Sequence, residues 1–538
     1  MKIHITGLVQ GVGFRPFVYR LAEELGLNGY ILNDMAGVLI EVEGDKRELD
    51  SFLTRVEKER PGISKIYSLR HSFLEETGFQ DFEIRKSEEH GEKNISILPD
   101  ISLCAECSGE ITDPKDRRFM YLFTNCTNCG PRFTITEEVP YDRGNTSMKE
   151  FSMCPRCQAE YDLPSDRRFH AQPNACHVCG PWISLYDSKG GLLCDKESAL
   201  EQALHYIRRG NIIAIKGIGG FHLVCDATNE EAVAGLRKRK HRDEKPMAVM
   251  FPDMEMIKRE TLVTETEERA ISSVERPVVI VKKKEGSSLA APVSPDNATV
   301  GVFLPYTPLH HIMLKKLRKP VIATSANMTD EPIAIDEQDA FKRLADIADY
   351  FLAHNRGIVR RCDDSVIRVA AGRQVPVRRS RGFAPVPVAI PFRLKRTVLA
   401  LGPHMNSTIA LGIGDRVYLS QHIGDLDTPL STGFYEETVN DLLRLFSIRP
   451  DIVVADMHPG YYSTKFGERN YGDRLLKVQH HHSHILSCMA ENDVSEDAEV
   501  IGFAFDGTGY GIDNTIWGGE VLIASYKGFR RAFSLRPF

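Results

Sequence analysis

Two CxxC pairs, Cys104-Ala105-Glu106-Cys107 and Cys126-Thr127-Asn128-Cys129, recur fifty residues later as Cys154-Pro155-Arg156-Cys157 and Cys176-His177-Val178-Cys179. A CxxC pair lets two thiolates reach one ion from a tight turn, and tetrahedral zinc needs two such pairs. The eight cysteines therefore supply ligands for two closed structural zinc sites. The spacing leaves open whether each zinc takes one repeat or a pair from each. Four thiolates leave no position for a substrate, so we expect a structural module.

The repeat extends beyond the cysteines. Asp116-Arg117-Arg118-Phe119 recurs as Asp166-Arg167-Arg168-Phe169, and Gly130-Pro131 recurs as Gly180-Pro181. This similarity indicates a duplicated module. The alternative is a disulfide framework, but residues 1–10 lack the apolar run of a signal peptide, and disulfides are rare in reducing compartments. We therefore expect zinc and a cytoplasmic location.

Length and composition describe a folded chain of several domains. The 538 residues exceed what one core supports, and 42% of them are hydrophobic. No stretch reaches the eighteen or more apolar residues of a membrane span, so we expect no membrane partner. The net charge of -6 gives no general attraction to nucleic acid, so we expect no nucleic-acid partner.

The hydrophobic pattern predicts a multidomain α/β protein. We divide it into a first region (1–88), a zinc module (100–186), a third region (196–388) and a fourth region (396–538). The first region has the order βαββαβ with a short extra strand, and helices are expected over 16–25 and 46–58. A charged linker over 86–93 follows it. The third and fourth regions alternate apolar strands with helices.

A glycine-rich loop near the N-terminus has the composition of an anion site. Gly11 and Gly13 precede Arg15 where a strand passes into a helix, so backbone N–H groups and a guanidinium converge. With Gly29-Tyr30-Ile31-Leu32-Asn33 on the next strand, the loop resembles acylphosphatases, which have a ferredoxin-like fold. The resemblance implies that Arg15 binds phosphate and Asn33 orients the attacking water. An acyl phosphate needs mainly positioning and charge stabilisation.

Two motifs in the third region resemble the nucleotide-binding domain of the YrdC/Sua5 family. Lys240-His241-Arg242 precedes Lys245-Pro246, and Ser325-Ala326-Asn327 follows an apolar strand. A charge run on a helix is otherwise a solvated face. The resemblance implies that Lys240, Arg242 and Lys245, with Ser325 and Asn327, bind ATP with Mg²⁺ and form a carbamoyl-adenylate. The spacing leaves open whether Lys238 or Lys240 is the matching lysine.

A second polar run in the third region has no assigned roles. It is more polar than a core strand tolerates, so we expect it to contact substrate or metal. Its members are His354, Asn355, Arg356, Arg360, Arg361, Asp363 and Asp364.

A histidine cluster begins a predicted helix in the fourth region. On a helix, His480 and His484 lie one turn apart and can share a metal ion, whereas His481 and His482 point elsewhere. The alternative is a solvated or capping cluster. Asp506 opens a glycine-rich segment expected to be a phosphate-approach loop. Together these features resemble the Kae1/TsaD carbamoyltransferases of the actin-like ATPase superfamily. That implies a further divalent metal, iron or zinc, and makes Asp506 a metal or phosphate contact.

The order of the four modules resembles the HypF family of hydrogenase maturation carbamoyltransferases. The resemblance implies cleavage of carbamoyl phosphate, formation of carbamoyl-adenylate with ATP, and transfer of the carbamoyl group to the C-terminal cysteine of the partner HypE for cyanide ligand synthesis. Since the fourth region then corresponds to the first lobe of the Kae1-like domain, we expect a C-terminally truncated chain that does not complete transfer.

Two other functions compete with this hypothesis. A tRNA threonylcarbamoylation enzyme would use modules like the third and fourth regions, but it leaves the first region without a task. A zinc-structured binding scaffold would make the flanking regions vestigial, and it predicts that Arg15→Ala and His480→Ala leave activity intact.

Overall fold

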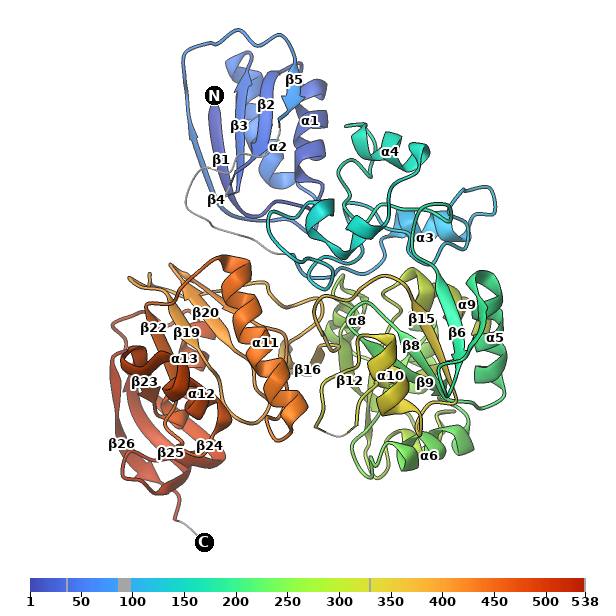
Figure 1. Ribbon diagram of the computed structural model, residues 1–538. Coiled ribbons are helices and arrows are strands. Elements are labelled where there is room, and N and C mark those ends of the chain that lie inside the picture. Colours follow the sequence, from blue (N-terminus) through green and yellow to red (C-terminus); the bar gives the residue numbers. More distant parts are fainter. Residues whose placement is uncertain (35–36, 86–97, 329, 537–538) are drawn as a thin grey trace. The chain divides into compact units, whose positions relative to one another are not determined.

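The computed structural model describes residues 1–34, 37–85, 98–328 and 330–536, and the predicted linker over 86–93 lies outside them. The chain forms two compact units. Unit 1 is Met1–Thr329 with Ile333–Phe383, and unit 2 is Asp330–Pro332 with Ala384–Phe538 (Figure 1). No helix among the described residues has the length and apolarity to cross a bilayer.

The first region is a five-stranded sheet with two helices. Its elements are β1 (Lys2–Leu8), α1 (Phe14–Glu24), β2 (Asn28–Asn33), β3 (Val38–Glu43), α2 (Lys46–Lys58), β4 (Lys65–Ser72) and β5 (Phe82–Ile84). The strand order is β4-β1-β3-β2-β5. Ile3 and Ile5 of β1 are fully buried, as the period of a half-covered strand requires. Helix α2 buries Leu49, Phe52 and Val56 at helical spacing. The predicted βαββαβ order with one extra strand is confirmed, since β4 and β5 both follow α2.

The zinc module has little regular structure. It contains α3 (Ala105–Thr112), the 3-10 turns η1 (Arg143–Asn145) and η2 (Ser147–Glu150), and α4 (Pro155–Asp162). Cys104 and Cys154 are the N-cap residues of α3 and α4, so the first CxxC pair of each repeat begins a helix. A proline at the first position of α4 suits this start, because its missing N–H has no partner there in any helix.

The third region is built on a mixed sheet with the order β17-β16-β12-β13-β10-β14-β9-β8-β15-β6-β7, with β11 beside β12. Its strands are β6 (Ile183–Asp187), β7 (Leu192–Asp195), β8 (Ile213–Lys216), β9 (Phe221–Asp226), β10 (Ala248–Met250), β11 (Thr261–Leu262), β12 (Val278–Lys283), β13 (Thr299–Phe303), β14 (Val321–Ser325), β15 (Tyr350–His354), β16 (Val366–Ala370) and β17 (Arg373–Arg378). Its helices are α5 (Lys196–Arg208), α6 (Glu230–Arg239), α7 (Met254–Glu260), α8 (Glu265–Ser272), α9 (Pro308–Leu317) and α10 (Glu337–Leu344), with the 3-10 turn η3 (Ala291–Val293). Strands β8 and β9 are buried throughout, since core residues cover both faces. The sheet begins at Ile183, before the predicted start of the region.

Unit 2 contains a six-stranded sheet in the order β18-β21-β20-β19-β22-β23 and a three-stranded sheet, β24-β25-β26. Its strands are β18 (Val388–Ala389), β19 (Val398–Ala400), β20 (Ala410–Ile413), β21 (Arg416–Leu419), β22 (Ile452–Asp456), β23 (Leu475–Val478), β24 (Val500–Tyr510), β25 (Ile516–Ser525) and β26 (Gly528–Ser534). Its helices are α11 (Pro429–Phe446), α12 (Tyr462–Tyr471) and α13 (His480–Glu491), with the 3-10 turn η4 (Gly472–Arg474).

The predicted phosphate-approach loop after Phe505 is wrong. Strand β24 continues to Tyr510, and its register against β25 shifts between Phe505 and Gly509. A β-bulge takes up extra residues without ending the strand, and glycines suit such a position. Asp506 therefore lies on a strand.

Candidate active sites and metal centres

The glycine loop of the first region places Arg15 beside Asn33. Gly11 and Gly13 have φ of 66° and 73°, which favours glycine, and Gly13 caps α1 just before Arg15. With its amide oxygen toward the guanidinium, Asn33 accepts hydrogen bonds from Arg15 Nε at 3.2 Å and Nη2 at 3.3 Å. The pair and the loop form a cationic cradle.

The zinc module lies against this cradle. A Cβ on Gly13 would lie 2.8 Å from Thr127 Oγ1, and one on Gly11 would lie 3.1 Å from Tyr141 Cδ1, so both glycines are needed for this close approach. Burial lowers the pKa of Arg15, whereas Asp142 and Tyr161 act in the opposite direction. The approach of the zinc module to Arg15 was not predicted from the sequence.

Each set of four cysteines in the zinc module belongs to one repeat. The Sγ atoms lie 3.6 Å apart for Cys104 and Cys126, and 3.5 Å apart for Cys107 and Cys129. Within each group all ligand atoms lie within 4.8 Å of one another. A tetrahedron of thiolates about 2.3 Å from zinc has sulfur atoms about 3.8 Å apart, so both groups fit structural zinc. The open question of ligand pairing is thus answered in favour of intact repeats. The groups are Cys104, Cys107, Cys126 and Cys129, and Cys154, Cys157, Cys176 and Cys179.

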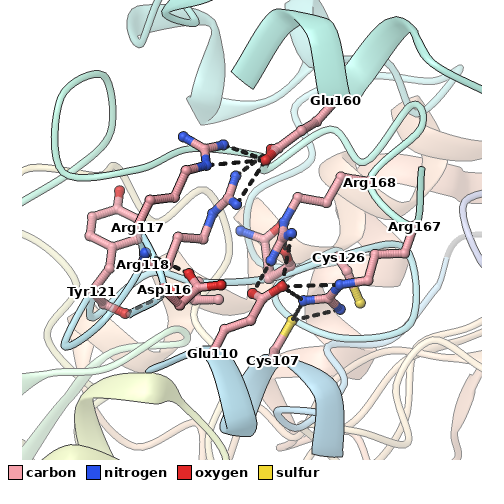
Figure 2. A network of polar contacts seen from close by, with 12 residues as sticks. Cys107, Glu110, Asp116, Arg117, Arg118, Tyr121, Cys126, Glu160, Arg167 and Arg168 are labelled. Atoms are coloured by element: carbon pink, nitrogen blue, oxygen red, sulfur yellow. Dashed lines mark hydrogen bonds and ion pairs between the residues drawn. The ribbon is translucent and has the colours of Figure 1, made fainter. Parts of the chain in front are cut away.

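The arginine pairs of the repeated motif connect the two zinc sites. Figure 2 shows that the arginines of each repeat reach across to the other repeat. Arg117 and Arg118 contact Glu160 at 2.6 and 2.5 Å. Burial acts to raise the pKa of Glu160, but the hydrogen bonds from the two arginines lower it to about 2.

The second half of this network mirrors the first. Arg167 contacts Glu110 at 2.5 Å, and Arg168 pairs with the same carboxylate. Arg167 also donates to Cys107 Sγ, as Arg117 donates to Cys157 Sγ, each at 3.3 Å. Each repeat therefore supplies positive charge to the thiolates of the other, which favours two mutually braced sites.

The third region brings its two predicted motifs together. Lys240 Nζ donates to Ser325 O at 2.9 Å and to Asn327 Oδ1 at 2.8 Å, and Ser325 Oγ donates to the same Oδ1 at 2.9 Å. Lys240 is buried, whereas Lys238 is exposed, so Lys240 is the lysine that joins the cluster. Burial lowers the pKa of Lys240 to about 7.

The other two cations of this motif are placed differently. Burial lowers the pKa of Arg242 to about 10, and its guanidinium donates to Lys245 O and Pro246 O. The Lys245 residue itself is exposed. The structure thus joins Lys240 to the serine and asparagine, and holds Arg242 against the following turn.

The histidine cluster of unit 2 converges on Asp506. His480 Nε2 and His484 Nε2 lie 3.2 Å apart, and they lie 2.9 and 3.4 Å from Asp506 Oδ2. Ligands of a tetrahedral metal about 2.05 Å away are about 3.3 Å apart, so three donors fit one ion and leave a position open. His481 and His482 instead contact the carbonyls of Gly518 and Ser525.

Asp456 is a residue of this site that the sequence analysis missed. Its Oδ2 lies 2.6 Å from His480 Nδ1. This contact is the largest cause of the raised pKa of His480, and it directs Nε2 toward Asp506. A carboxylate directly after the apolar strand Ile452–Asp456 was the available signal.

Family models match every region. The matched families are described as Acylphosphatase (1–84), HypF finger (103–136 and 153–186), Telomere recombination of the Sua5/YciO/YrdC type (205–380), HypF Kae1-like domain (393–491), and Carbamoyltransferase, Kae1-like Domain, second subdomain (502–538). The last match adds a segment of the second subdomain to the expected first lobe, and it coincides with β24–β26.

Similarity over nearly the whole of this chain supports the same family. The chain is 47% identical to a Synechocystis protein named Carbamoyltransferase HypF, over 100% of this chain and 70% of the relative. It is 43% identical to a Probable carbamoyltransferase HypF of Methanocaldococcus jannaschii, over 97% and 68%. A crystal structure of full-length HypF, described as phosphate- and nucleotide-bound, has a TM-score of 0.94 at 44% identity and covers 98% of this chain and 69% of that chain.

Proposed function

Since this chain belongs to the HypF family of carbamoyltransferases, we propose that its sites carry out successive steps of one carbamoyl transfer. The substrates are carbamoyl phosphate and ATP, and the acceptor is the C-terminal cysteine of HypE. The transferred group becomes a cyanide ligand of [NiFe]-hydrogenase. We place the protein in the cytoplasm, because eight free zinc-binding thiols require a reducing compartment.

The first step is cleavage of carbamoyl phosphate at the glycine loop. Backbone N–H groups at Gly11 and Gly13 and the guanidinium of Arg15 hold the phosphate, and Asn33 orients the attacking water. The water oxygen bonds to phosphorus, the bridging P–O bond breaks, and carbamate leaves, while the hydrogens of the water stay on phosphate. Carbamate leaves as a stable anion, so the site works by positioning and charge stabilisation without a general base. The products are phosphate and carbamate.

The second step is adenylation of carbamate in the third region. Lys240 and Arg242 hold triphosphate and carboxylate oxygens, Lys245 adds positive charge, and Ser325 and Asn327 contact the nucleotide. A carbamate oxygen attacks the α-phosphorus of Mg²⁺-bound ATP, and pyrophosphate leaves. Because the pKa of Lys240 is about 7, a bound triphosphate would favour its protonated form. The related structure described as phosphate- and nucleotide-bound supports both steps.

The third step, transfer to the cysteine of HypE, is the one that the sequence analysis expected this chain not to complete. We assign it to the histidine site, where the cysteine thiolate would attack the carbamoyl carbon of the adenylate and AMP would leave. His480, His484 and Asp506 would hold a divalent iron or zinc ion, which supplies Lewis acidity when bound. Asp456 keeps His480 in the tautomer that presents Nε2.

One observation carries the proposal. The Arg15–Asn33 pair and the Lys240–Ser325–Asn327 cluster both form complete polar sites within one compact unit. A threonylcarbamoylation enzyme or a zinc scaffold has no use for the first of these sites.

Pyrophosphate exchange into ATP tests the proposal. We expect exchange with carbamoyl phosphate in the wild-type chain, and loss of both phosphate release and exchange in Arg15→Ala. Lys240→Met should lose exchange but keep phosphate release. Exchange that requires threonine plus bicarbonate and ignores carbamoyl phosphate would instead identify the tRNA modification activity.

A further inference from the structure

A cavity inside unit 1 lies between the zinc module and the third region. Its volume is about 30 Å³, and its wall includes Phe123 and Pro131 of the zinc module and Lys216, His354 and Arg356 of the third region. A water needs about 10–15 Å³ measured in this way, so the cavity has room for about two waters or one molecule of a few atoms. It is too small for a nucleotide.

Arg356 is a buried cation without a partner among the residues that the structure describes. The residue is 4% exposed and lines the cavity. Throughout the described ranges, no residue forms a hydrogen bond or ion pair with its guanidinium, which lies over the ring of Phe123 at 5.3 Å from the ring centre. A buried charge that is neither paired nor hydrogen-bonded is strongly unfavourable.

Other buried arginines of unit 1 show what is usual. Arg132 donates to the carbonyls of Cys129 and Cys126 at 2.8 and 3.1 Å, and Arg381 contacts Asp364 at 2.7 Å. Lys216, in the same cavity wall, contacts Glu337 at 2.6 Å. Arg356 is therefore an exception that a bound anion would explain.

The acidic groups around Arg356 do not replace such an anion. Asp100 interacts with it electrostatically, but its Oδ1 accepts from Arg132 N at 2.7 Å and Thr134 Oγ1 at 2.8 Å. Burial raises the pKa of Asp100, against the hydrogen bonds from Arg132 and Thr134, which act to lower it. The phenols of Tyr121 and Tyr141 have raised pKa values because of burial, so both stay neutral.

His354 is a second buried residue of the cavity wall. Its Nε2 lies 2.9 Å from Gly217 O, and a carbonyl only accepts, so Nε2 carries the hydrogen. Nδ1 is then an acceptor, and in the part of the chain that the structure describes it has no partner. Burial lowers the pKa of His354 well below its usual value, which keeps the ring neutral.

We propose that Arg356 and His354 form a binding site for carbamate between the zinc module and the third region. The guanidinium would hold the two oxygens of the planar anion, and the Nδ1 acceptor would receive a hydrogen bond from its amino group. The inference rests on the proposed function, which releases carbamate in the first region and consumes it in the third. Bicarbonate has the same shape and charge and also carries a donor, so the test must separate the two anions.

Arg356→Gln and Arg356→Lys test the site by activity, with the exposed Arg373→Gln as the matched control. Loss of a charge-assisted hydrogen bond costs about tenfold to a hundredfold, so carbamoyl phosphate-dependent pyrophosphate exchange should fall by that factor in Arg356→Gln and recover partly in Arg356→Lys. Phosphate release should stay within about twofold, because it occurs at a separate site. Unchanged exchange in Arg356→Gln overturns the proposal. A wild-type chain with bicarbonate replacing carbamoyl phosphate identifies bicarbonate as the ligand if exchange is equally fast.

Bromide tests the anion site without any activity. Crystals of the full chain in sodium bromide should show an anomalous peak within hydrogen-bond distance of the Arg356 guanidinium. The peak should be absent from Arg356→Gln crystals. It should also disappear from Arg356→Lys crystals when bicarbonate is added to compete with bromide. Absence of the peak in the wild-type chain overturns the site. Absence of exchange in the wild-type chain, with the peak present, overturns the proposed function and leaves a general anion site. Thermal unfolding of each variant shows whether lost exchange reflects lost folding.

Discussion

The cysteine sites and the histidine site hold their donor atoms in opposite ways. Cys107 and Cys129 are fully buried, and arginines of the opposite repeat brace their module. The side chain of His484 is 57% exposed, and among the described residues it forms a group of three donors with His480 and Asp506. Four enclosed thiolates suit a structural zinc ion, whereas three donors would leave one position of a tetrahedral ion open. The two kinds of donor group therefore differ in enclosure and in the number of donors.

The largest expected effect comes from opening a cysteine site. Cys107→Ser should lose about one of the two zinc ions and unfold the zinc module, because structural zinc contributes roughly 10–16 kcal/mol of apparent binding energy. Zinc content by mass spectrometry and thermal unfolding measure this effect. Cys488→Ser, at an exposed cysteine outside both groups, should change neither value. Retention of two zinc ions in Cys107→Ser would contradict the closed arrangement.

A smaller effect is expected from the arginine network. Glu160→Ala removes the carboxylate from Arg118, whose side chain is 2% exposed, and breaking a buried ion pair costs about 3–5 kcal/mol. We expect the lower end, since Glu160 retains 20% exposure. Urea unfolding gives the free energy. Glu137→Ala breaks an exposed pair with Lys149 and should cause no measurable change. Equal stability of the two variants would show that the crossed network does not brace the module.

Asp456→Asn should affect only the histidine site. Loss of a carboxylate behind a metal-binding histidine lowers metal affinity about 10- to 100-fold. Cobalt titration followed by absorbance measures this affinity, and Asp497→Asn, at an exposed carboxylate, is the control. The two zinc ions of the module should remain bound. Unchanged cobalt affinity would show that His480 does not depend on Asp456.

The smallest effect is the pH dependence that separates the sites. Hydrogen bonding to Asp456 raises the pKa of His480 above 6.5, so without metal this contact stabilises unit 2 below pH 6.5 and is lost as pH rises through the raised pKa. A metal must displace that proton, so cobalt affinity should fall by up to about tenfold for each pH unit below the pKa. Titrations between about pH 6 and pH 8 check this, and Asp456→Asn should move the transition to lower pH. A constant affinity would remove His480 from the ligands.

Sequence reasoning succeeded where a function depends on spacing along the chain. Three features could be predicted from the sequence because a tight turn or one turn of a helix brings their residues together. They are the CxxC frame, the Gly11–Arg15 loop and the His480–His484 pair. Asp506 was predicted to contact metal or phosphate, and it lies with His480 and His484 although its local structure was predicted wrongly. Its segment was expected to be a loop, but the glycines are accommodated in the bulged strand β24.

Other features depended on contacts between distant segments. Arg117 and Arg118 were seen as a repeat, but their partner Glu160 lies in the other copy of the module. The roles of the polar run from His354 to Asp364 could not be predicted from the sequence. Whether a buried arginine is paired depends on which carboxylates lie near it in space: Arg381 contacts Asp364, whereas Arg356 Nε has no hydrogen-bond partner among the described residues.

The amino-acid sequence alone determined the identity and order of the modules, the eight cysteines of the zinc module and the class of chemistry, because each follows from residue types at short spacing. The tertiary structure alone decided that each zinc site uses one repeat, that the arginines cross between repeats, that Asp456 orients His480, and that Arg356 is buried with no partner in the described part of the chain. These features depend on which side chains, distant in the sequence, meet in a buried environment. There the strength of a charge interaction depends on the neighbouring groups and not on where the residues lie in the chain.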